Sequence, residues 1–163
     1  MASPTENTPT NSLAWRSNHP GHWLRLALER FDAQVMDGMA RHPGVSLGLS
    51  NLAARGQVGA AHLHITRHLP PEGARLTDLA RAAGMTKQAM GTLVNQCEAW
   101  GMVRRASEST DGRAKRVLFT EAGLAWLAAY QEAVAQADAD LRQAVGDQVA
   151  TVITLGLEAY CSA

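Results

Sequence analysis

Residues 76–123 decide the fold, and they read LTDLARAAGMTKQAMGTLVNQCEAWGMVRRASESTDGRAKRVLFTEAG. Thr77 can cap a short helix that runs through Ala83, because a Thr hydroxyl accepts a backbone N–H at a helix start. Gly84 supplies the left-handed conformation that commonly ends a helix. A second helix, capped by Thr86, follows directly. The segment therefore predicts two short helices joined by a tight turn.

The second helix is expected to run to Trp100, where Gly101 ends it. A helix-turn-helix needs a small residue at the helix crossing, a glycine at the turn and apolar residues that dock the second helix. The residues at the corresponding spacings are Ala80, Gly84, Met90 and Leu93. A plain helical hairpin with a solvated face is the simpler alternative for so short a match.

The two faces of the second helix differ in character. Its expected buried stripe consists of Ala89, Met90, Leu93, Val94 and Cys97, and its outward face of Lys87, Gln88, Thr92, Asn95 and Gln96. Asn and Gln can bond adenine through two hydrogen bonds, Lys can reach guanine or phosphate, and Thr can contact a thymine methyl group or a phosphate. The outward face is therefore suited to reading a DNA groove.

A hairpin is predicted after this helix, because Asp111-Gly112 lies between apolar flanks that begin at Val103 and end at Phe119. Its cations outnumber its acids; they are Arg104, Arg105, Arg113, Lys115 and Arg116. A basic hairpin beside a recognition helix can reach phosphates or a minor groove. The combination predicts a winged helix.

Residues 76–83, 86–101 and above all 111–123 resemble the MarR family of winged helix-turn-helix transcriptional regulators. The resemblance implies a dimeric regulator with a helical dimerisation layer and, often, a small-molecule effector site. It also implies that Asp111 supports the wing tip and that Arg113 enters the minor groove. Gly91 and Thr92 depart from the family pattern, which commonly has a polar residue followed by Arg, so no base preference is carried over.

The expected fold is mainly α, with a winged helix-turn-helix lobe, a small β-hairpin wing and a helical dimerisation layer. Its predicted parts are a tail at 1–17, an N-terminal helix and loop at 18–56, the DNA-binding lobe at 57–120 and C-terminal helices at 121–163. The predicted DNA-binding residues are Thr86, Lys87, Gln88, Thr92, Asn95, Arg105, Arg113, Lys115 and Arg116.

Helical periodicity extends to both ends of the chain. Apolar residues recur through His22 to Met39, and again along two C-terminal stretches. The first of these has its seam at Leu127, Tyr130, Val134, Ala137, Leu141 and Ala144; the second has Val149, Val152, Ile153, Gly156 and Tyr160 on one side. Neither stretch has an obvious internal partner, so we expect the first and last helices to pack against a second copy of the chain.

Charge is distributed unevenly along a chain whose formal net charge is zero. Lys and Arg number 8 against 4 acids over residues 75–116, but 1 against 6 over residues 117–163. This favours a nucleic-acid surface in one segment. No secretory signal or membrane span is recognisable, and two cysteines form no disulfide framework, so a cytoplasmic protein is expected.

Two other site patterns are weighed and set aside. Gly44–Gly48 matches the Gly-x-Ser-x-Gly nucleophile elbow, but its flanks are those of a helix and a loop, so no enzyme is predicted. His64 and His68 are four residues apart and could bind a metal ion, although a polar helix flank is the simpler interpretation. No cofactor is predicted, and a metal-responsive switch remains an alternative.

Effector and redox chemistry give weaker signals. Trp23, Phe31 and His62, together with the family's preference for aromatic or phenolic effectors, suggest a ligand site above the DNA-binding lobe. Cys97 falls on the buried stripe and is expected to be inert. The sequence thus predicts a homodimeric regulator that binds a pseudo-palindromic operator, and the resemblance implies a repressor that is released by an effector. A ligand- or protein-binding module without specific DNA binding is the alternative.

Overall fold

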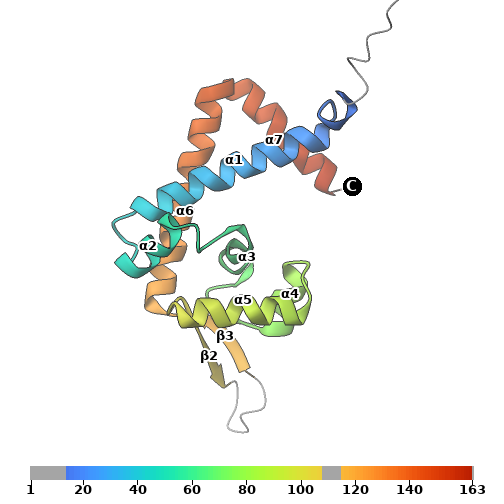
Figure 1. Cartoon of the computed structure of the whole chain (residues 1–163). Helices are drawn as coiled ribbons and strands as arrows, with labels where there is room; N and C mark the ends of the chain where they lie inside the picture. The colour runs from blue at the N-terminus through green and yellow to red at the C-terminus, as the bar shows by residue number, and fades with distance from the viewer. Residues whose placement is uncertain (1–13, 108–114, 163) are drawn as a thin grey trace, which may run out of the picture. The chain divides into compact units, whose positions relative to one another are not determined.

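The computed structural model describes residues 14–107 and 115–162 and confirms a mainly helical fold with one small antiparallel sheet (Figure 1). The chain divides into two compact units, residues 1–33 and 34–163. Each unit is described by itself. Within the described residues, no helix is long and apolar enough to span a membrane.

The first unit contains a short 3-10 helix, η1 (Ala14–Arg16), and the first turns of α1 (Pro20–Arg41). The predicted first helix is confirmed and is slightly longer than its apolar pattern suggested. The large apolar side chains of η1 and of the first turns of α1 are mostly exposed; they include Trp15, Trp23, Leu24, Leu26 and Leu28. Exposed apolar surface of this kind is typical of interaction sites.

The second unit begins in the last turns of α1, where Val35 and Met39 are fully buried. Two short helices follow, α2 (Leu47–Ala54) and α3 (Ala60–His68). The sequence did not predict α2. Its residues include one glycine and one serine among apolar residues, a composition that also fits a loop. Leu49 and Ala53 are nevertheless buried.

The predicted helix-turn-helix is present as α4 (Leu76–Ala82) and α5 (Lys87–Ala99). Gly84 has φ +63, the left-handed conformation that the turn requires. Thr86 caps α5, because its hydroxyl accepts the backbone N–H of Ala89 at 3.2 Å. The predicted cap at Thr77 was wrong. The cap position is two residues earlier, at Arg75, which has extended backbone and makes no side-chain cap.

The sheet has the order β1-β3-β2 and is antiparallel throughout; its strands are β1 (Ala74–Arg75), β2 (Val103–Ser107) and β3 (Lys115–Phe119). The predicted hairpin is confirmed, with Val103 opposite Phe119. The strand β1 was not predicted. The turn residues Asp111 and Gly112, and with them Arg113, lie outside the described residues.

Two long helices complete the chain, α6 (Glu121–Val145) and α7 (Asp147–Ser162). The expectation that α6 lacks an internal partner was wrong. The helix buries Trp126, Ala129, Ala133 and Ala137 inside its own chain. A Cβ atom added at Gly38 of α1 would lie 3.1 Å from Cβ of Ala133, so small residues let these helices approach closely.

The last helix is mostly exposed in the single chain. Within the described part of α7, Ala150 is the one buried residue. Its exposed apolar side chains are Val149, Val152, Ile153, Leu155, Leu157 and Tyr160. Apolar surface of this extent is typical of interaction sites.

Candidate nucleic-acid interface

The recognition helix α5 is anchored by its apolar face. Met90, Leu93, Val94 and Cys97 are buried, as the sequence predicted. Ala89 is exposed, so its assignment to the buried stripe was wrong. The reason is geometric: Met90 and Val94 centre the buried stripe, and Ala89 lies about 100° away from Met90 around the helix.

The amino-terminal end of α5 carries three exposed polar side chains from consecutive residues, Thr86, Lys87 and Gln88. The Thr86 hydroxyl accepts the Ala89 N–H and keeps its own hydrogen for an outside acceptor. Within the described parts of the chain, the Lys87 and Gln88 side chains make no hydrogen bond or ion pair. The helix dipole and these donors together favour a phosphate or a base acceptor at this end.

Thr92 lies one turn further along the same exposed face. Its hydroxyl donates to the backbone carbonyl of Gln88 at 3.2 Å, so toward solvent it offers its methyl group and oxygen lone pairs. Gly91 is half-buried, and a Cβ atom added there would lie 3.8 Å from Leu76 Cδ2, an ordinary contact. The packing of α4 against α5 therefore does not require a glycine at this position.

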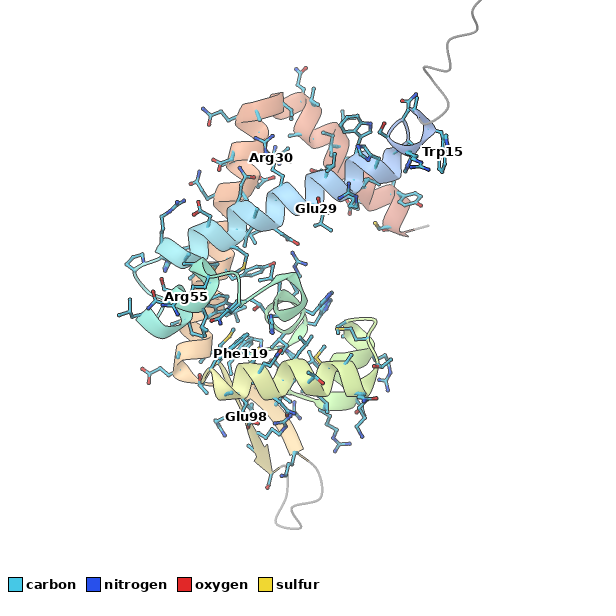
Figure 2. The ribbon with its side chains drawn as sticks, viewed as in Figure 1. Trp15, Glu29, Arg30, Arg55, Glu98 and Phe119 are labelled. Atoms are coloured by element: carbon cyan, nitrogen blue, oxygen red, sulfur yellow. The ribbon has the colours of Figure 1, made fainter. Side chains whose placement is uncertain are left out.

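Arg105 on β2 is fixed by two residues of α5. Its guanidinium forms an ion pair with the Glu98 carboxylate and donates to Asn95 Oδ1 at 2.6 Å. The Arg105 backbone N–H also donates to Glu98 Oε1 at 3.1 Å. Figure 2 shows Glu98 on the side of α5 next to β2. The sequence analysis did not identify Glu98. The available signal was its position seven residues before Arg105, on the other side of the predicted end of the helix.

The cations of β3 differ in their surroundings. Lys115 is exposed at the start of the strand, beside the turn of the hairpin. Arg116 is half-buried, and its guanidinium donates to the backbone carbonyl of Gly73 at 2.5 Å. Arg116 thus ties β3 to the segment before β1. Of these predicted wing cations, Lys115 is exposed, whereas Arg116 and Arg105 have structural partners.

His62 on α3 connects that helix to α5. Its Nε2 lies 2.8 Å from Gln96 Oε1, and its ring packs against Trp100 with centroids 4.7 Å apart. Of the other predicted effector residues, Trp23 is exposed and Phe31 half-buried, and both belong to the first unit, whereas His62 belongs to the second. The structure therefore gives His62 a definite role in linking helices, which the sequence did not indicate.

A shallow, mainly apolar groove of about 450 Å³ lies between α3 and α6. Its lining residues are Thr66, Arg67, Leu127, Tyr130, Gln131 and Val134. Arg67 Nε donates to the Tyr130 hydroxyl at 2.9 Å, so a cation and a phenol converge at one place in the groove.

Among the residues considered for other chemistry, His64 has a buried Nδ1 atom without a hydrogen-bond partner. His64 and His68 stack with their ring centroids 6.0 Å apart, and the described residues contain no group of three possible metal ligands. Ser46 precedes α2 with φ −57 and ψ 145, an unstrained conformation. Burial raises the pKa of the Cys97 thiol to about 12, which keeps the unreactive thiol form.

An exposed polar recognition helix packed on a second short helix, with an antiparallel hairpin directly after it, defines a winged helix-turn-helix protein. The model of the MarR family matches residues 63–114. The resemblance predicted from the sequence is therefore confirmed for this segment. The sequence has no match among the curated proteins.

Solved structures share the fold along most of the chain. The transcriptional repressor CouR, bound to a 23-mer DNA duplex, is 19% identical with a TM-score of 0.64, and the match covers 91% of this chain and 96% of CouR. A Mycobacterium tuberculosis MarR family protein in complex with salicylic acid is 22% identical, with a TM-score of 0.59 and coverages of 87% and 96%. Bordetella bronchiseptica BpsR, whose DNA binding is regulated by 6-hydroxynicotinic acid, is 17% identical, with a TM-score of 0.64 and coverages of 90% and 96%.

Proposed function

We propose that this protein is a sequence-specific, DNA-binding transcriptional regulator. The observation that carries the proposal is the end of α5, where Thr86, Lys87 and Gln88 are exposed together on a helix whose opposite face is buried. Recognition helices of this kind contact bases through their first residues. CouR, which has the same fold, is bound to a DNA duplex in its structure, and this supports a DNA-binding role for the present chain. Such a role belongs in the cytoplasm.

The hairpin β2–β3, which we call the wing, supplies the second contact. Lys115 is exposed at the end of β3 that adjoins the turn, and Arg113 is two residues before it in the chain. We assign Lys115 to a phosphate and Arg113 to the minor groove, with Asp111 supporting the turn. Neither Asp111 nor Arg113 lies within the described residues, so both roles rest on the family resemblance.

A second copy of the chain is the partner that α7 requires. The helix exposes six large apolar side chains, and the amino-terminal part of α1 exposes several more. A homodimer that buries these helices, from the 18–56 and 121–163 segments, would place two copies of α5 in successive major grooves about 34 Å apart. The operator is therefore expected to be a pseudo-palindrome.

A small aromatic acid or phenol is the effector that the chemistry favours. The α3–α6 groove combines the apolar side chains Leu127 and Val134 with the Arg67 guanidinium and the Tyr130 hydroxyl. An aromatic ring can lie against Leu127 and Val134. A carboxylate on that ring can accept hydrogen bonds from the Arg67 guanidinium and the Tyr130 hydroxyl. The salicylic acid complex and the 6-hydroxynicotinic acid regulation of proteins with this fold support the ligand class. Arg67 and Tyr130 are therefore the residues to test first, ahead of Trp23 and Phe31. His62 stays among the residues to test.

Release of DNA by such a ligand makes the protein a repressor. A ligand that binds the DNA-free arrangement more tightly weakens DNA binding, typically by about 1–3 kcal/mol of coupling. The test is operator affinity with and without salicylate, measured for wild type and for Arg67→Leu. The repressor model predicts weaker DNA binding with salicylate and loss of that response in Arg67→Leu. A ligand that strengthens DNA binding would instead make the protein a corepressor-dependent or activating regulator.

A further inference from the structure

Two side-chain amides on the exposed surface of α5 have their oxygens engaged from outside the helix. They belong to Asn95 and Gln96, both of which the sequence assigned to the outward face. Asn95 is contacted by Arg105 of β2, and Gln96 by His62 of α3. These contacts determine which end of each amide is available to DNA.

The orientation of Asn95 follows from the chemistry of its partner. Arginine has donors and no acceptor, so the atom that lies 2.6 Å from Arg105 Nη2 must be the amide oxygen. Glu98 prevents Arg105 from turning away, because its carboxylate accepts both from the guanidinium and, at 3.1 Å, from the Arg105 backbone N–H. The oxygen of Asn95 is therefore held toward β2, and its NH₂ group points the other way.

The orientation of Gln96 follows from the tautomer of His62. The backbone N–H of Gly59 donates to His62 Nδ1 at 3.1 Å, so Nδ1 is an acceptor and the ring hydrogen is on Nε2. That hydrogen points to an acceptor 2.8 Å away, which must be the oxygen of Gln96. Packing of the His62 ring on Trp100 fixes its position. The NH₂ group of Gln96 is thus also the free end.

We infer that Asn95 and Gln96 recognise DNA as hydrogen-bond donors, because Arg105 and His62 engage their amide oxygens and leave the NH₂ groups as the unengaged ends. This rests on the proposed DNA-binding function. Reading adenine needs an amide that donates and accepts together, in a bidentate pair. A donor alone matches an acceptor atom: O6 or N7 of guanine, O4 of thymine, or a phosphate oxygen. The expectation that these residues read adenine is replaced.

The cluster of Glu98, Arg105 and Asn95, which we call the clasp, makes Arg105 a positioning residue. Its charge is matched by Glu98, and its side chain is only about one-quarter exposed. Arg105 therefore acts on DNA through Asn95 and contributes little phosphate attraction of its own. The salt dependence of DNA binding separates these roles, because each phosphate contact adds about one to the slope of log K against log salt.

The experiment uses the full-length protein and its operator, with every base pair of one half-site replaced in turn. Affinities are measured for wild type, Asn95→Ala, Asn95→Asp and Arg105→Lys. Asn95→Asp is the sharpest variant, because a carboxylate keeps a partner for Arg105 but cannot donate. We expect Asn95→Asp to lose about tenfold or more in operator affinity. Asn51→Asp, at an exposed position of α2, is the control for the added charge.

The base profile identifies the acceptor. If the wild-type preference that disappears in Asn95→Ala is for guanine or thymine, the amide donates to a base. If Asn95→Ala weakens all duplexes equally, the donor binds a phosphate oxygen. Both results support the inference. A lost preference for adenine would overturn it, as would an Asn95→Asp variant that binds like Asn51→Asp. We expect Arg105→Lys to broaden the preference at the same position without changing the salt slope.

The clasp can also be measured without DNA. Rotation of the Arg105 guanidinium, followed by side-chain ¹⁵N NMR, should be slow in wild type and fast in Glu98→Gln. Fast rotation in both proteins would overturn the clasp. Absence of any operator preference in wild type, with slow Arg105 rotation, would instead overturn the proposed function while leaving the clasp in place.

Discussion

Trp126 of α6 donates its indole N–H to the hydroxyl oxygen of Thr66 on α3, across 3.1 Å. Trp126 is fully buried and Thr66 is 4% exposed, so water cannot replace either partner. The contact joins the long C-terminal helix to the helix that precedes the helix-turn-helix. It shows that α6 is part of the core of this chain, in addition to any role between two copies.

Thr66→Val tests the energy of this contact. Valine has nearly the same shape but leaves the indole N–H buried without an acceptor, which costs about 1–3 kcal/mol. We expect the urea midpoint of unfolding to fall accordingly. Thr66→Ser, which keeps the hydroxyl, is the matched control and should retain more of the stability. A Thr66→Val protein as stable as wild type would show that the hydrogen bond contributes nothing.

The two wing cations assigned to DNA should respond differently to salt. Lys115→Ala should reduce the slope of log K against log salt by about one, because a phosphate contact is lost. Arg113→Ala should weaken operator binding by about 1–3 kcal/mol and leave the oligomeric state unchanged. Arg55→Ala removes an exposed cation outside the helix-turn-helix and serves as the control. Equal effects of Lys115→Ala and Arg55→Ala would contradict the wing assignment.

The exposed face of α7 predicts the behaviour of a charged variant. Val152 is 69% exposed in the single chain, so Val152→Asp should fold normally yet place a charge in the dimer interface. Sedimentation should show that the Val152→Asp protein is a monomer. A chain that lacks residues 147–163 should also sediment as a monomer. Gln148→Asp adds the same charge at an exposed polar position of α7 and is the control. A Val152→Asp protein that sediments as a dimer would place the interface elsewhere.

Cys97 should be unreactive in the folded protein. Burial raises its pKa from 9.0 to about 12, so at pH 8 it is almost entirely a thiol. In a Cys161→Ser background, a thiol reagent should label nothing until the protein is denatured. Because the folded pKa is raised, this group contributes stability that is complete below pH 9 and is lost as the pH rises toward 12. Rapid labelling of the native Cys161→Ser protein would contradict the buried assignment.

Local signals predicted the turn and the wing because each depends on a few neighbouring residues. Gly84 has the left-handed backbone that its turn requires, Thr86 caps α5, and Asp111-Gly112 lies between two paired strands. The cap at Thr77 was wrong for a non-local reason. Arg75 pairs with Arg116 in the sheet, so the helix begins immediately after the strand and the Thr77 signal is overridden.

The core contacts of α6 were not predictable from large apolar residues. The sequence emphasised Leu127, Tyr130 and Val134, which are half-buried, whereas Ala129 and Ala133 are buried. Alanine carries a weak hydrophobic signal in a pattern, and its value here is that it lets Gly38 approach. The contact between Gly38 and Ala133 can be recognised only when the positions of α1 and α6 in the structure are known.

The side-chain partners at the DNA-facing surface likewise needed three-dimensional information. Lys87 and Gln88 were correctly predicted to be exposed. The sequence could not show that Arg105 and Arg116 bind Glu98 and the Gly73 carbonyl, because those partners come from different elements. Charge counts over a segment therefore overestimate the number of cations that are available to phosphates.

The most direct test is fluorescence anisotropy of the purified protein with the DNA upstream of its own gene, titrated with salt and with unlabelled random duplex. A specific regulator predicts saturable binding that survives an excess of random duplex and is weakened by Lys87→Ala. If random duplex competes equally and the affinity falls steeply with salt for every sequence, charge alone accounts for binding. That result would contradict the assignment of α5 as a recognition helix and favour a ligand- or protein-binding module.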